Sequence, residues 1–227
     1  MYSESLLPNG AALWRSQGST GGAVIPADGS VDLILRDSRL FVAGPSTMRI
    51  VSERDGEGGS LGLRIPPGHA AQLFGPVLPE IADQLVPFSD LGHGPGAGQL
   101  REAMLGLGRG ETSVANLARA TSAHTADNAW ADAVRRAAGG LVPAGSAAEQ
   151  FGASERSFRR RMLGAFGYGY ATLVRIERAS RARALLEGGS SLSDAAATAG
   201  FSDQPHLSRE FQRLVGMSPS QFAASSA

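Results

Sequence analysis

Two stretches near the C-terminus repeat each other at a constant offset, and this repeat constrains the fold more than any other feature of the chain. Five residues each have a counterpart of similar type or size 49 positions later. The pairs are Phe158 and Leu207, Arg160 and Arg209, Met162 and Phe211, Gly167 and Gly216, and Leu173 and Phe222. An internal repeat of this kind indicates two copies of one supersecondary unit.

Each copy is typical of a helix-turn-helix. Gly152-Ala153-Ser154 matches Gly200-Phe201-Ser202 at an offset of 48, and a short Ala-rich segment precedes each triplet. Ser154 and Ser202 are predicted N-caps of the helices that follow, because a serine oxygen accepts hydrogen bonds from first-turn amides. The apolar pairs Phe158/Met162 and Leu207/Phe211 are spaced i, i+4, so they face inward. A doubled helix-turn-helix favours DNA recognition.

A longer helix is predicted between the two units, over residues 171–186, and about 16 residues of helix span about 24 Å. Gly188-Gly189 should end it, and Ser191 with Asp194 predicts a capping box at the start of the second unit. The arginines of the linking helix are expected to form surface ion pairs with Glu177 and Glu187. They are Arg175, Arg178, Arg181 and Arg183.

The first half of the chain has a different pattern. Short apolar or alternating runs at 11–14, 31–35, 40–43, 48–51 and 61–65 are separated by Gly, Pro, Asp and Ser clusters, which predicts strands of an antiparallel sandwich or small barrel. Helices are predicted over 81–85, 99–107 and 111–138. The fold class is therefore α+β, with a β-rich domain (1–100), a helical connector (101–139) and an all-α domain (140–227) in which a long helix joins two helix-turn-helix units.

Composition excludes several chemistries. All 21 basic residues are Arg, so a P-loop lysine or a Schiff-base lysine cannot exist. The absence of Cys excludes disulfides, zinc fingers and thiol nucleophiles. Residues 1–129 hold 9 Arg against 13 acids and residues 130–227 hold 12 against 8, so the halves carry −4 and +4. No signal peptide or membrane span is expected, which favours a cytoplasmic protein.

Two sequence features could suggest an enzyme, and neither has the context that an enzyme needs. Gly58-Gly59-Ser60-Leu61-Gly62 matches the G-x-S-x-G string, but that motif needs a strand-to-helix turn and Ser60 falls in a predicted hairpin. The four histidines, His69, His93, His124 and His206, are scattered. We therefore expect no enzyme, no catalytic residue, no metal and no cofactor. The alternatives are a protein-interaction module or a cupin-like metal enzyme fused to a helical domain.

The segment from Ala196 to Phe222 closely resembles the second helix-turn-helix of AraC-type transcription regulators. The matching residues are Gly200, Phe201, Arg209, Phe211, Gly216, Pro219 and Phe222. The first unit resembles the first half of the same domain, so the resemblance covers roughly residues 130–225. It implies a sequence-specific DNA-binding transcription regulator whose two recognition helices enter successive major grooves, about 34 Å apart.

The N-terminal half is similar, more weakly, to the β-rich domains of short regulators of this family. The similarity lies in Trp14, residues 26–34, residues 42–45 and residues 64–68. Such domains sense a small molecule, mediate dimerisation, or both. The expected partner is double-stranded DNA, and the resemblance leaves open a small-molecule effector, RNA polymerase and a second copy of the chain; no membrane partner is expected.

Motif position predicts which side chains contact DNA. The base-facing candidates are Arg156, Arg159, Arg160, Gln204, His206, Ser208 and Arg209. Arg can bridge O6 and N7 of guanine, and Gln can pair with adenine. Ser154 and Ser202 cap their helices in this interpretation, and nearby amides could hold phosphates. Arg161 is left out as a phosphate or interhelical partner.

Two departures from the family pattern concern the first helix of the first unit and the recognition helix of the second unit. Gly145 lies in the first helix of the first unit and Ala147 is small for its position, which predicts a looser first unit. Pro205 falls in the first turn of the second recognition helix, where it is tolerated.

Overall fold

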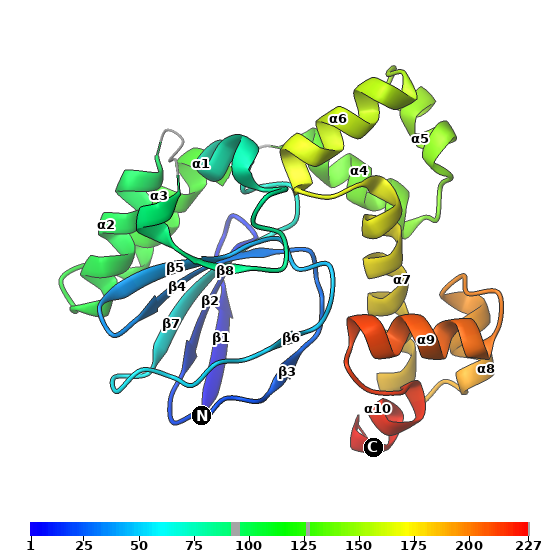
Figure 1. Cartoon of the computed structure of the whole chain (residues 1–227), viewed down its shortest axis with the longest axis horizontal. Helices are drawn as coiled ribbons and strands as arrows, with labels where there is room; N and C mark the ends of the chain where they lie inside the picture. The colour runs from blue at the N-terminus through cyan, green and yellow to red at the C-terminus, as the bar shows by residue number, and fades with distance from the viewer. Residues whose placement is uncertain (92–95, 126–127, 227) are drawn as a thin grey trace.

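The computed structural model describes residues 1–91, 96–125 and 128–226. An antiparallel β-sheet domain is followed by a helical domain, which confirms the α+β class (Figure 1). Strands and short helices form the first domain. They are β1 (Tyr2–Leu6), β2 (Ala12–Ser16), β3 (Val24–Ile25), β4 (Val31–Arg36), β5 (Arg39–Ala43), β6 (Ile50–Val51), β7 (Ser60–Ile65), α1 (Ala71–Phe74), η1 (Gly75–Val77), β8 (Leu85–Pro87) and η2 (Phe88–Asp90).

The remaining elements are helices. They are α2 (Ala97–Gly108), α3 (Val114–Thr125), α4 (Ala129–Gly139), α5 (Ala144–Gln150), α6 (Glu155–Phe166), α7 (Tyr170–Glu187), α8 (Leu192–Thr198), α9 (Gln204–Leu214) and α10 (Pro219–Ser226). We call α5 with α6 unit one and α8 with α9 unit two. Within the described residues, no helix is both long enough and apolar enough to cross a membrane.

The six-stranded sheet has the order β1-β2-β7-β4-β5-β8, and β3 pairs with β6 in a separate two-stranded ribbon. Central strand β4 alternates as its sequence predicts, with Val31, Leu33 and Leu35 buried. Its hairpin to β5 turns through Asp37 and Ser38, whose φ angles are 48° and 61°. Two positive φ values are the requirement of a tight type I′ turn, which matches the twist of the flanking strands.

One expected helix is wrong. Residues 81–84 form a turn that leads directly into strand β8, which pairs with β5. Asp83 adopts a left-handed backbone (φ 60°), and its carboxylate accepts hydrogen bonds from the Thr47 amide (2.6 Å) and hydroxyl (2.6 Å). These tertiary hydrogen bonds stabilise the turn over the helix that local propensity favours.

Two hydrophobic cores divide the chain. The first lies between the sheet and helices α1 to α3, and its buried residues include Leu33, Leu63, Phe74, Leu100 and Met104. The second joins α4 to α10. Helix α4 therefore packs with the helix-turn-helix units, while α2 packs with the sheet (Figure 1). The boundaries expected at residues 100 and 139 remain a prediction.

Candidate nucleic-acid interface

Recognition helix α6 begins where the serine cap was predicted. The Ser154 hydroxyl accepts a hydrogen bond from the Ser157 amide at 3.3 Å. Phe158 and Met162 are buried, so this pair faces the core as expected. The candidate base-contacting residues Arg156, Arg159 and Arg160 are all exposed, so their guanidinium groups are accessible to a duplex.

Arg161 has an interhelical role. Its guanidinium lies over the Trp130 ring of α4, 3.9 Å from the ring centroid. A cation–π contact of this geometry joins α6 to α4 and stabilises the placement of the recognition helix. The structure thus confirms the interhelical expectation for Arg161 and separates it from its three neighbours.

Helix α9 begins one residue later than predicted, and the expected cap by Ser202 is wrong. The N-cap is Asp203, whose carboxylate accepts a hydrogen bond from the His206 amide at 2.6 Å. A cap accepts from the amide two or three residues further on, and the third residue after Ser202 is Pro205, which has no N–H. Moving the cap to Asp203 places His206 at that position. Pro205 lies in the first turn, as predicted.

The side chains of α9 divide into two groups. Gln204, Ser208 and Arg209 are exposed. His206 is half-buried, with its ring edge-on to Phe201 at a centroid distance of 5.3 Å and an interplanar angle of 88°. Its Nδ1 also lies 3.1 Å from the Ser202 hydroxyl. Ser202 and His206 therefore stabilise the turn before α9, and a base contact by either stays a prediction.

The first helices of the two units are short. Ser191 caps α8, accepting a hydrogen bond from the Asp194 amide at 3.1 Å, and it donates to the Asp194 carboxylate at 2.6 Å. Helix α5 begins at Ala144, so Gly145 lies in its first turn rather than in its interior. Ala147 is fully buried, so its small size suits close packing of α5.

Helix α7 connects the two units and has 18 residues, so it is about 27 Å long. Figure 1 shows α6 at one end of α7 and α9 at the other, each with its first turn directed away from the β-sheet domain. The two recognition helices therefore lie at opposite ends of α7, and both begin on the side away from the sheet.

The expected ion pairs along α7 are only partly present. Arg183 pairs with Glu187 at 3.9 Å, whereas Glu177 pairs with Arg135 of α4 at 3.7 Å. Arg181 donates to the Gly139 carbonyl and Arg175 to the Thr172 hydroxyl at 3.1 Å. The long arginine side chain can reach an acceptor on another helix, as Arg181 does. Residue spacing within α7 alone therefore could not predict these partners.

The residues weighed for enzyme chemistry lie elsewhere. Ser60 is the first residue of β7, inside a strand and not at a strand-to-helix turn. His69 Nε2 lies 3.0 Å from the Asp132 carboxylate, and His93 falls outside the described residues. Among the residues that the structure describes, no group of three or more His, Asp or Glu side chains is placed to hold a metal ion.

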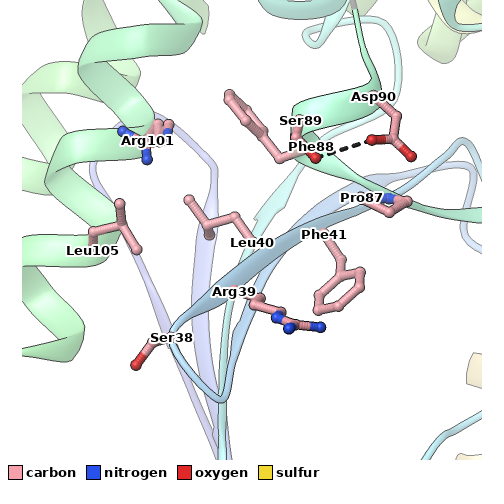
Figure 2. A pocket seen from close by; sticks show the side chains of 10 residues that line it. All are labelled: Ser38, Arg39, Leu40, Phe41, Pro87, Phe88, Ser89, Asp90, Arg101 and Leu105. Carbon is pink, nitrogen blue, oxygen red and sulfur yellow. Dashed lines mark hydrogen bonds between the residues drawn. The ribbon is translucent and has the colours of Figure 1, made fainter.

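An open cavity of about 500 Å³ lies at the β5–β8 edge of the sheet. Figure 2 shows Leu40 on the α2 side of strand β5, with Arg39 and Phe41 on the opposite side. The cavity is formed by the sheet domain and helix α2, so it adds no surface to α6 or α9.

Comparison with known proteins agrees with this geometry. The fold defines a protein with two helix-turn-helix units on one connecting helix. Residues 147–225 match the family model described as "Helix-turn-helix domain". The match covers 79 of the 227 residues, so it describes the C-terminal region and not the whole chain. A search of curated proteins gave no match to the chain.

Solved structures of ToxT from Vibrio cholerae resemble the whole chain at low identity. A 1.65 Å structure shares 12% identity with a TM-score of 0.45, covering 99% of this chain and 97% of that one. ToxT bound to (E)-4-(8-methylnaphthalen-1-yl)but-3-enoic acid shares 10% with a TM-score of 0.44, covering 100% and 99%. A likeness of this extent says nothing about what the chain binds.

Proposed function

We propose that the chain regulates transcription by inserting α6 and α9 into successive major grooves of one DNA duplex. The observation that carries this proposal is the pair of exposed polar helix faces, Arg156/Arg159/Arg160 on α6 and Gln204/Ser208/Arg209 on α9, at opposite ends of α7. The span of α7, about 27 Å, is close to one turn of DNA, about 34 Å. We therefore expect the protein to cover a DNA site of about two helical turns.

Arg209 is the residue of α9 best suited to read a base, because it is exposed and bidentate contact with guanine needs a free guanidinium. We expect Arg209→Ala to weaken specific binding by about 1–3 kcal/mol and to relax the preference at one base pair. Gel shifts on a duplex selected from random DNA, with each base pair varied, measure both effects. Arg101→Ala is the matched control, because Arg101 is exposed on α2, remote from α9. Unchanged affinity and base preference in Arg209→Ala would sink the assignment.

Salt dependence separates DNA binding from the alternative of a protein-interaction module. Each phosphate neutralised by an arginine releases counterions, so the logarithm of the affinity falls linearly with the logarithm of the salt concentration. For the four arginines proposed to contact DNA, Arg156, Arg159, Arg160 and Arg209, we expect a slope of several units. An apolar protein interface would give little salt dependence.

We also propose that a small-molecule effector would bind between the two domains. A cavity of about 280 Å³ is lined by Asp28 and Arg64 from the sheet domain and by Arg135, Glu177 and Arg183 from the helical domain. Burial raises the pKa of Glu177, and the Arg135 guanidinium partly offsets this rise. The lining suits a small polar molecule with charged groups. Thermal-shift and gel-shift measurements with candidate metabolites test this, with Glu177→Gln as the variant that should lose any response.

A further inference from the structure

The N-terminal domain contacts the C-terminal end of both recognition helices. The contacting residues, which we call the junction surface, are Val24, Ala27, Gly29, Pro45, Arg49 and Gly68. Four of them lie in the segments 26–34, 42–45 and 64–68.

At unit two, residues of the junction surface donate hydrogen bonds to the backbone carbonyls at the C-terminal end of α9. The Ala27 amide donates to the Leu214 carbonyl at 2.8 Å, and the Arg49 amide donates to the Arg213 carbonyl at 3.2 Å. The Arg49 guanidinium donates to the Gln212 carbonyl at 3.2 Å. The last four carbonyls of a helix lack intrahelical partners, and a cation there also complements the helix dipole. Arg49 and Ala27 therefore bind the C-terminal turn of α9 directly.

At unit one, the contact is made by packing. The buried Tyr168, two residues after α6, donates its hydroxyl to the Gly29 carbonyl at 3.3 Å. A Cβ on Gly29 would lie 2.1 Å from that hydroxyl, so only glycine fits. A Cβ on Gly68 would lie 2.8 Å from the ring of Phe166, the last residue of α6.

The repeat makes the two contacts equivalent. Gly167 and Gly216 are counterparts at the offset of 49 and both have positive φ, 79° and 91°. A Cβ on Gly167 would lie 2.7 Å from Pro45 Cγ, and one on Gly216 would lie 2.3 Å from Val24 Cγ1. Both units thus present the same glycine, after the recognition helix, to the same domain.

We propose that the junction surface fixes the separation and orientation of α6 and α9, and that Arg49 is a positioning residue for DNA binding. The proposal rests on the proposed function, because it concerns how two DNA-reading helices are held. Helix α7 attaches to each unit at one place. The junction surface attaches to each unit at a second place. With two attachments, each unit resists rotation about α7, so the protein should accept one spacing of its two groove contacts.

The test is a spacing series on DNA. A duplex selected from random sequence by the full chain is compared with versions carrying two extra base pairs between the two protected segments. Two base pairs displace one groove contact by about 7 Å and rotate it by about 70°. We expect the wild type to lose about 5- to 150-fold in affinity, the range typical of coupled sites.

Arg49→Ala should bind the original duplex more weakly and show a spacing penalty at least about threefold smaller. Arg49→Lys keeps a cationic donor and should retain most of the penalty. Arg54→Ala removes the same charge from an exposed position nearby and should change neither value. Gly29→Ala, which displaces Tyr168, should reduce the penalty from the unit-one side. If Gly29→Ala fails to fold, the Arg49 series decides.

Three results would overturn the positioning role. One is an unchanged spacing penalty in Arg49→Ala. A second is an Arg49→Ala variant whose log-affinity against log-salt slope is smaller by about one while its spacing penalty is unchanged. That result would make Arg49 a direct phosphate contact. The third is a wild type with two protected segments but no spacing penalty. A wild type that selects no duplex would contradict the proposed function as well.

Discussion

The triple variant Arg156→Ala/Arg159→Ala/Arg160→Ala should lose the DNA contacts of unit one and keep those of unit two. Each good base contact contributes about 1–3 kcal/mol of discrimination, so three lost contacts should cost at least about 3 kcal/mol, a factor of about 150. The three residues are exposed, so their removal should leave the core of α6 intact. We expect the nuclease footprint on a selected duplex to contract from two helical turns to about one.

Two controls make this result specific. Gln204→Ala/Arg209→Ala should remove the other half of the footprint, because both side chains are exposed on α9. Arg161→Ala removes a charge from the same helix, but its guanidinium stacks on Trp130, so it should lower stability by about 0.5–2 kcal/mol and preserve the footprint. A full-length footprint in the triple variant would mean that these three arginines do not hold unit one on the DNA.

The helical domain was largely predictable because its determinants are local or periodic. The offset repeat placed Phe158 and Met162 in the core, and Ser154 capped its helix as expected. The cap of α9 was misassigned by one residue, although the sequence contained the necessary signal. The Pro205 nitrogen cannot donate a hydrogen bond, so a cap at Ser202, three residues before it, has no partner at the third position. Asp203 has such a partner in the His206 amide.

The sheet domain was less predictable, because its edge strands depend on distant partners. Strand β1 is short and exposed throughout, so its sequence has no apolar alternation, and only pairing with β2 defines it. The segment 81–85, expected as a helix, forms a turn and the start of β8, because Asp83 accepts a hydrogen bond from Thr47 and β8 pairs with β5. No local pattern encodes either interaction.

The junction surface could not have been inferred from the sequence at all. The segments that contain Gly29 and Gly68 stand out in sequence, but their partners Tyr168 and Phe166 are about a hundred or more positions away. The positive φ of Gly29 and Gly68 could be expected of any turn glycine. The structure adds a second reason, because the helical domain lies so close that a side chain at either position would clash with it. Only the folded arrangement connects these segments with the recognition helices.

Phe166→Ala should cause a large loss of stability, because this side chain is buried and packs against both domains. Phe166 is 1% exposed, lies 6.1 Å from the Trp130 ring and 5.9 Å from the Tyr168 ring, and abuts Gly68 of the sheet domain. Truncating a buried Phe to Ala typically costs about 3–5 kcal/mol. For a chain of this size that corresponds to a melting temperature lower by about 6–20 °C.

Urea unfolding followed by tryptophan fluorescence measures this cost, since Trp130 lies in the affected cluster. Phe166→Leu retains most of the volume and should cost less than about 1.5 kcal/mol. Phe211→Ala is the matched control in unit two, since Phe211 is as buried as Phe166 but packs on Phe222 of α10. We expect a similar loss of stability from Phe211→Ala, but only Phe166→Ala should also reduce the spacing penalty on DNA, because only Phe166 lies against Gly68. Equal spacing penalties in the two variants would show that unit one is held in place by α7 alone.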